Sequence, residues 1–110
     1  MKIENIPFKS VNWEEIPETH HPGETGFATW RTVEKGNVRV RLVEYSPGFL
    51  ADHWCARGHV IHILKGELTS ELKDGSRSFL KAGMTYMMSD DEANPHRSYT
   101  QKGVSLFIVD

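Results

Sequence analysis

Apolar and polar residues alternate along much of this chain, with the period of two that half-buried strands show. The clearest example is residues 38–45, VRVRLVEY, which follow a second strand-like run, residues 25–33, across the turn residues EKGN. β-branched and aromatic residues, which favour strands, are frequent in both runs. We therefore predict a β-hairpin over residues 25–45.

Glycine and proline divide the rest of the chain into segments of about strand length. These segments are residues 49–55, 59–73, 77–80, 84–89, 95–100 and 104–109. None keeps a helical period over three turns, and Asp74-Gly75 is a hairpin-turn signal. Many short strands between turns predict an all-β, antiparallel sandwich or barrel.

Length and composition predict one globular domain without nucleic-acid or membrane partners. The 110 residues fit a single core, with an N-terminal extended arm over residues 1–25, which holds three prolines, and a barrel over 26–110. The net charge is −2, with both signs interleaved, so we expect no nucleic-acid partner. No apolar run approaches the roughly 18 residues of a membrane span, and the first residues lack a signal-peptide pattern, so we expect a cytoplasmic protein.

Three of the six histidines and the single cysteine fall within residues 53–62. On a strand, His53 and Cys55 would project to the same side. A turn through residues 56–58 would place His59 beside them if the two strands are adjacent and antiparallel, whereas His62 would face away. His96 is the only other histidine in the strand-rich region, so it is the candidate for a fourth member.

Imidazole and thiolate are good ligands for transition metals and poor ones for magnesium or calcium. The cluster therefore predicts a transition-metal site, but two other interpretations stay open at this point. A histidine on a strand is often a packing residue, and a buried free cysteine often acts as a small apolar side chain. Cys55, which has no disulfide partner in the chain, would alternatively be a nucleophile activated by a neighbouring histidine.

The same stretch resembles the first motif of the cupins, G-x(5)-H-x-H-x(3,4)-E-x(6)-G. Gly48, His53, Cys55, His59 and Gly66 occupy its positions, with a first gap one residue shorter than the motif. Cys55 stands in place of the second histidine and His59 in place of the glutamate. Residues 52–55, DHWC, also resemble the DHCW motif of a group of bacterial cupins, with the last two letters exchanged.

A second cupin motif, G-x(5)-P-x-G-x(2)-H-x(3)-N, is recognisable in a degraded form. Gly83 and His96 match its glycine and histidine, but the segment between them is two residues longer and lacks the P-x-G core. The resemblance covers about residues 38–110. It implies a cupin-like double-stranded β-helix (jelly-roll barrel) of two facing sheets, often dimeric, with one divalent metal.

The resemblance places the metal ligands at His53, Cys55, His59 and His96. Relative to the motif, a thiolate replaces one imidazole and an imidazole replaces the carboxylate. The ligand charge stays at −1 while the site becomes softer, which favours zinc, nickel or iron over manganese.

Four further residues are candidates for a substrate pocket. Arg39, Arg41 and Tyr45 share one face of residues 38–45, which the usual rule of apolar-in, polar-out assigns to solvent. If the interior of the barrel is polar instead, they would form a set that binds a carboxylate. Tyr86 alternates with Met84 and Met88 and is expected in the pocket wall or the core.

The sequence supports two functions from different classes. One is an enzyme that acts on a small polar or carboxylate-bearing metabolite at the metal, with no catalytic base or nucleophile evident outside the cluster. The other is a non-catalytic cupin that binds or senses a small ligand and has a closed, structural metal site.

Asp52 is interpreted as a surface acid or as a partner that orients a ligand imidazole. Arg97, Tyr99 and His62 suit a homodimer interface.

Overall fold

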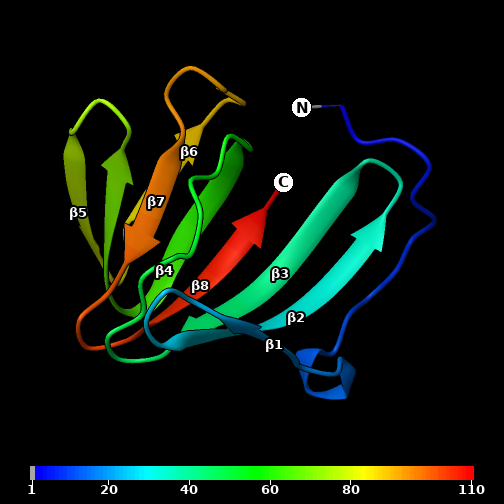
Figure 1. The fold of residues 1–110 in the computed structure, drawn as a ribbon. Coiled ribbons are helices and arrows are strands. Elements are labelled where there is room, and N and C mark those ends of the chain that lie inside the picture. Colours follow the sequence, from blue (N-terminus) through cyan, green and yellow to red (C-terminus); the bar gives the residue numbers. More distant parts are fainter. Residues whose placement is uncertain (1) are drawn as a thin grey trace.

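The computed structural model describes residues 2–110 as an antiparallel β structure (Figure 1), which confirms the predicted fold class. A short 3-10 helix, η1 (Trp13–Glu15), comes first. The strands are β1 (Thr19–Pro22), β2 (Phe27–Lys35), β3 (Val38–Tyr45), β4 (His59–Leu72), β5 (Arg77–Lys81), β6 (Thr85–Met88), β7 (His96–Tyr99) and β8 (Val104–Val109). Within residues 2–110, no helix is long and apolar enough to cross a membrane.

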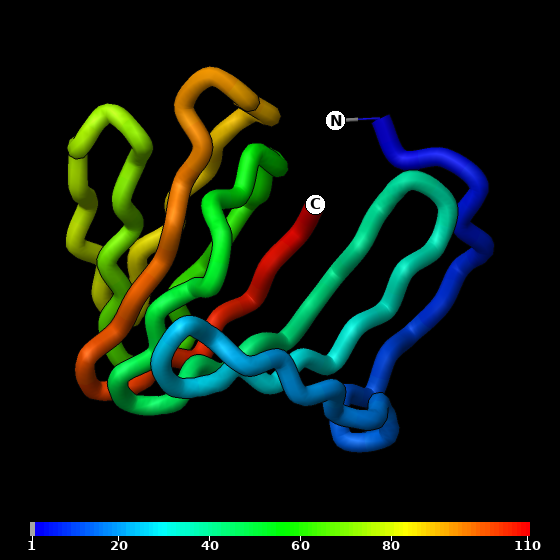
Figure 2. The backbone as a smooth tube through the Cα atoms, viewed as in Figure 1, coloured from blue at the N-terminus to red at the C-terminus, as the bar shows by residue number. Residues whose placement is uncertain are grey.

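The strands form two halves that share β4. Their order is β1-β2-β3-β8-β4-β5, with β6 and β7 also paired to β4. The first part of β4 pairs with β8 and β6, and its last part pairs with β5 and β7. Figures 1 and 2 show the resulting halves inclined to each other, with β4 running through both. Gly66, at a φ of 86°, lies where β4 passes from one half to the other.

The core lies between the two halves. One face of β4 is buried at alternate residues, His59, Ile61 and Ile63, and β8 is buried at alternate residues in the same way. The buried apolar cluster consists of Val43, Ile61, Ile63, Leu68, Leu80, Val104, Leu106 and Ile108. This close-packed cluster is the rigid support for the polar residues that lie at one end of the space between the two halves.

The predicted hairpins are confirmed. β2 and β3 pair in register from Ala28 opposite Tyr45 to Lys35 opposite Val38, across the turn at Gly36. β4 and β5 pair across the turn that contains Asp74 and Gly75. The other predicted segments, apart from residues 49–55, also form strands within a few residues of their expected bounds.

The predicted strand over residues 49–55 is wrong. This stretch is a loop with isolated bridges at Leu50 and Cys55, and Asp52 and His53 lie in a bend. Its backbone runs beside β7, where Ala51 donates to the Ser98 carbonyl and Cys55 pairs with His96, and Leu50 also bonds to Thr25. The pairing with β7 is interrupted because more residues separate Leu50 from Cys55 than separate their partners Tyr99 and His96, so Asp52 and His53 bulge out of it.

The predicted arm, residues 1–25, contributes η1 and β1, and its first residue lies outside the described residues. β1 pairs with β2, opposite Ala28 and Trp30 among others. The Arg31 guanidinium donates to the carbonyls of Trp13 and Ile16, which ties η1 to the sheet. The division between arm and barrel stays a prediction.

Candidate metal centre

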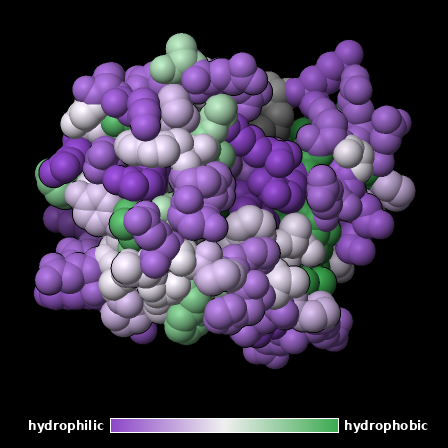
Figure 3. Space-filling model, viewed as in Figure 1, coloured by the Kyte–Doolittle hydropathy of each residue, from purple (hydrophilic) through white to green (hydrophobic). Residues whose placement is uncertain are grey.

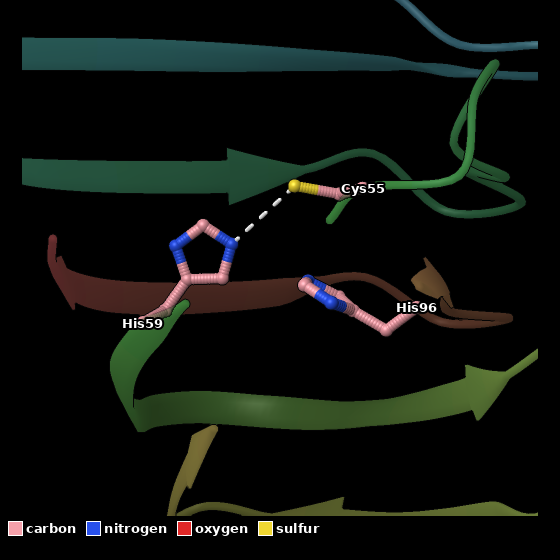
Figure 4. A group of neighbouring side chains, drawn as sticks. All are labelled: Cys55, His59 and His96. Atoms are coloured by element: carbon pink, nitrogen blue, oxygen red, sulfur yellow. Dashed lines mark hydrogen bonds between the residues drawn. The ribbon is translucent and has the colours of Figure 1, made fainter. Parts of the chain in front are cut away.

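Cys55, His59 and His96 converge at one end of the space between the two halves (Figure 4). They come from the loop before β4, the first residue of β4 and the first residue of β7. Their potential ligand atoms all lie within 4.8 Å of one another. Cys55 and His96 exchange two backbone hydrogen bonds, of 2.7 and 2.9 Å, so this single bridge fixes two of the three side chains relative to each other.

The spacing of these atoms suits one tetrahedral metal ion. A thiolate at about 2.3 Å and an imidazole nitrogen at about 2.1 Å from one ion lie about 3.6 Å apart. The distance from Cys55 Sγ to His59 Nε2 is 3.7 Å. The widest pair in the group would need to contract by up to about 1.4 Å. The residues therefore fit a transition metal in both donor chemistry and spacing.

Asp110 orients His59, a role that was not predicted from the sequence. Its Oδ2 lies 2.6 Å from His59 Nδ1, and its side chain is almost fully buried. When Nδ1 donates its proton to a carboxylate, Nε2 becomes the free acceptor, and Nε2 is the nitrogen that faces Cys55. This carboxylate–imidazole pair joins residues 51 positions apart, so no local motif signals it.

Two arginines keep Asp110 ionised. Arg39 donates two hydrogen bonds to its carboxylate, of 2.7 and 3.0 Å, and Arg41 donates one of 2.8 Å. Burial alone would raise the pKa of Asp110, but the hydrogen bond from Arg39 and the charge of Arg41 outweigh it and hold the pKa well below its usual range. The carboxylate that orients His59 is thus charged at neutral pH.

Both histidines of the group are neutral at pH 7 and available as ligands. Burial, together with the nearby His59 and His53, lowers the pKa of His96 to about 4. Burial also lowers the pKa of His59, although its hydrogen bond to Asp110 acts in the opposite direction. The two rings meet edge to face, with centroids 5.1 Å apart, so neither blocks the other's nitrogen by stacking.

The structure does not bring His53 into this group. Its side chain is 72% exposed, and its Nδ1 lies 2.6 Å from Asp52 Oδ1. The predicted pairing of His53 with Cys55 assumed a strand, and the bend at this point turns the two side chains apart. Asp52 therefore partners a histidine outside the group of three. His53 still lines the adjoining cavity, and its role as a ligand stays a prediction.

The expectation that Arg39, Arg41 and Tyr45 face solvent is wrong. Arg41 is only 5% exposed, and all three residues line a cavity of about 460 Å³ that also borders Cys55. The polar face of β3 points inward because Asp110, at the end of β8, supplies a buried counter-charge. The interior of this end of the barrel is polar, which was the alternative interpretation of these residues.

Tyr86 lies elsewhere. It packs against the hydrophobic cluster and is not among the cavity's lining residues. Burial raises the pKa of its hydroxyl to about 12. Met84, which precedes β6, is 39% exposed, whereas Met88, the last residue of β6, is half-buried.

Comparison by sequence identifies no relative. No family model matches the chain, and no curated protein matches it significantly.

Comparison by structure identifies many similar folds at low sequence identity. An RmlC-like cupin from Shewanella frigidimarina aligns with a TM-score of 0.74 at 14% identity, over 96% of this chain and 92% of that one. A predicted oxalate decarboxylase from Thermotoga maritima aligns with a TM-score of 0.73 at 14% identity, over 92% and 96% of the two chains. Fe(II)-HppE, solved with an alternative substrate, gives 0.73 at 12% identity over 99% of this chain and 62% of its own.

The TM-scores establish the shared fold, whereas identities this low single out no group of cupins, so the likeness to the DHCW group stays a prediction. The chain has the cupin fold.

Proposed function

We propose that this protein binds one divalent transition-metal ion through Cys55, His59 and His96. The observation that carries the proposal is the convergence of three soft or borderline ligands, one of them oriented by a buried carboxylate. Zinc, nickel and iron are the candidate metals, because a thiolate with two imidazoles disfavours magnesium and calcium. Fe(II) is the ion named for one structural neighbour.

We propose further that the ion has an open coordination position. Three protein ligands on the wall of a cavity leave room for water or a small ligand, the arrangement found in catalytic zinc sites. A metal in such a position acts as a Lewis acid or lowers the pKa of a bound water. The protein would then be an enzyme acting on a small polar or carboxylate-bearing metabolite, by analogy with other proteins of this fold.

The alternative is a closed site in which His53 is the fourth ligand, as in a binding or sensing protein. Its position on the cavity wall favours this alternative, and its exposure and its pairing with Asp52 oppose it. The absorption spectrum of the cobalt-substituted protein separates the two. Bands that change when small acids are added support an open position, whereas strong tetrahedral bands that no ligand perturbs indicate a closed site.

A second candidate function uses Cys55 as a nucleophile. Cys55 Sγ lies 3.7 Å from His59 Nε2, and His59 Nδ1 lies 2.6 Å from Asp110 Oδ2. This is the order of thiol, base and orienting acid in cysteine hydrolases. Iodoacetamide distinguishes this role from coordination. Rapid labelling of the protein as purified supports the nucleophile, whereas protection that disappears when a chelator is added supports the metal ligand.

A further inference from the structure

The cavity beside Cys55 contains more guanidinium groups than carboxylates. Arg39, Arg41 and Arg57 all converge on the one carboxylate of Asp110. That carboxylate also accepts from His59, and Oδ2 receives three of its four hydrogen bonds. Three positive charges around one negative charge leave a positive excess on the cavity wall, where the low dielectric strengthens its attraction for an anion.

Two of these arginines have unused donors. Within residues 2–110, Arg41 donates a single side-chain hydrogen bond, to Asp110, and its buried Nε has no acceptor. Arg57 Nε lies 3.8 Å from Asp110 Oδ1, beyond hydrogen-bond distance, and the Arg57 side chain is 49% exposed. Buried donors without acceptors are unfavourable, so a ligand that supplied acceptors here would gain free energy.

The rest of the wall is apolar and aromatic. Trp30, Tyr45, Phe49, Ile61 and Ile108 line the same cavity, and its volume of about 460 Å³ lies in the range of small-molecule sites. Tyr45 and Phe49 stack with ring centroids 4.1 Å apart, which gives this wall a fixed shape. Figure 3 shows strongly hydrophilic side chains near the middle of the face, close to the end of β8. The cavity thus combines an apolar wall with a cationic one.

We infer that the cavity binds an organic acid whose carboxylate accepts hydrogen bonds from Arg41 and Arg57 and whose apolar body lies against Tyr45 and Phe49. This inference rests on the proposed function, since it names the class of ligand that would lie next to the proposed ion. Both arginines approach the carboxylate that orients His59, so the bound acid is placed beside the metal centre. Guanidinium forks match the planar, two-oxygen geometry of a carboxylate.

Calorimetric titration with benzoate and with benzamide, its neutral counterpart of nearly the same shape, tests the inference. The protein is used both as purified and after the metal has been removed with a chelator, and the metal content of each sample is measured. We expect benzoate to bind both forms, at least about tenfold more tightly than benzamide, with affinity that falls as salt is added. Equal binding of the two compounds, or no binding of benzoate to either form, would overturn the inference.

Substitutions of the arginines test whether their guanidinium groups bind the benzoate carboxylate. Arg57→Met removes a half-exposed guanidinium and should weaken benzoate binding by about tenfold or more. Arg77→Met is the matched control, because Arg77 is similarly exposed on β5, outside the cavity. Arg41→Lys keeps the charge but loses the fork and should also weaken binding. Unchanged affinity in Arg57→Met would contradict the inference.

The two forms of the protein separate this inference from the proposed function. Benzoate that binds only the metal-loaded protein, with unchanged affinity in Arg57→Met, would coordinate the ion; the arginine site would then be wrong and the metal site right. If the protein contains no metal as purified and takes none up, but binds benzoate in a way that depends on Arg57, the arginine site would be right and the metal site wrong.

Discussion

Asp110 joins the metal centre to the cationic wall, since it accepts hydrogen bonds from His59, Arg39 and Arg41. Removing one member of a buried charge network leaves the others uncompensated, which is more costly than losing a surface ion pair. The charge of Asp110 is therefore important for stability as well as for the orientation of His59.

Asp110→Asn should lower the free energy of unfolding by about 3 to 5 kcal/mol, because it leaves two buried arginines with a neutral partner. Urea denaturation of the metal-free protein measures the change. Asp52→Asn is the control, since Asp52 is an exposed acid paired with an exposed histidine, and it should cause no measurable change. Equal effects of the two substitutions would contradict the role given to Asp110.

The stability of the metal-free protein should fall as the pH drops from about 6.5 toward 4. The pKa of His96 is about 4 in the folded protein, whereas a histidine in an unfolded chain has a pKa of about 6.5, so the unfolded chain binds a proton first within this window. The loss through His96 is on the order of 2 to 3 kcal/mol. Denaturation at a series of pH values measures it, and His96→Asn should flatten the slope. A wild-type slope that persists in His96→Asn would exclude His96 as its source.

Individual site residues were predictable to different degrees. Cys55 and His59 could be selected because few residue types bind transition metals and their spacing matched a known motif, and His96 because it is the only other histidine in the strand-rich region. Asp110 could not, because an aspartate after a strand is usually solvated and its partners are distant in the sequence. The inward orientation of Arg41 could not be predicted without that counter-charge.

At the scale of elements, alternation and turn residues were sufficient for the long strands β2, β3 and β4, whose pairing with a neighbour is continuous. They were misleading for the loop between β3 and β4. Residues 49–55 have the length of a strand and lie between turn residues, but their apolar and polar positions do not alternate, and their pairing with β7 is interrupted at Asp52 and His53. The predicted pairing of His53 with Cys55 rested on that strand.

The passage of β4 between the two halves depends on Gly66. Gly66 has a φ of 86°, and a Cβ there would lie 2.3 Å from the carbonyl oxygen of Gly103. Gly83 has a similar φ of 92° with no atom within 4 Å of such a Cβ, so it is a matched control. Any difference between alanine variants at these positions therefore reports the close approach and not the backbone conformation.

Gly83→Ala should cost about 1 to 2 kcal/mol, the usual penalty for a left-handed residue other than glycine. Gly66→Ala should cost about 1 to 3 kcal/mol more, because the backbone of Gly103 must also shift. Thermal or urea denaturation compares the two. Equal costs would show that the strand crossing at Gly66 is not tightly packed.

At the scale of the whole molecule, the cupin fold was predictable because two separated motifs and the strand pattern agreed on it. The polar interior at one end was not, since it depends on β3 and β8 lying side by side. The homodimer predicted from Arg97, Tyr99 and His62 stays a prediction, and sedimentation velocity across a broad concentration range would test it.

Elemental analysis of untagged protein, purified without added metal, is the most direct test of the metal centre. His96→Ala and His53→Ala variants are analysed beside the wild type. We expect close to one equivalent of a single transition metal in the wild type, its loss in His96→Ala and its retention in His53→Ala. Loss in His53→Ala as well would favour the closed, four-ligand site. A wild-type protein that contains no metal, and takes up none under reducing conditions, would show that the proposed metal centre is wrong.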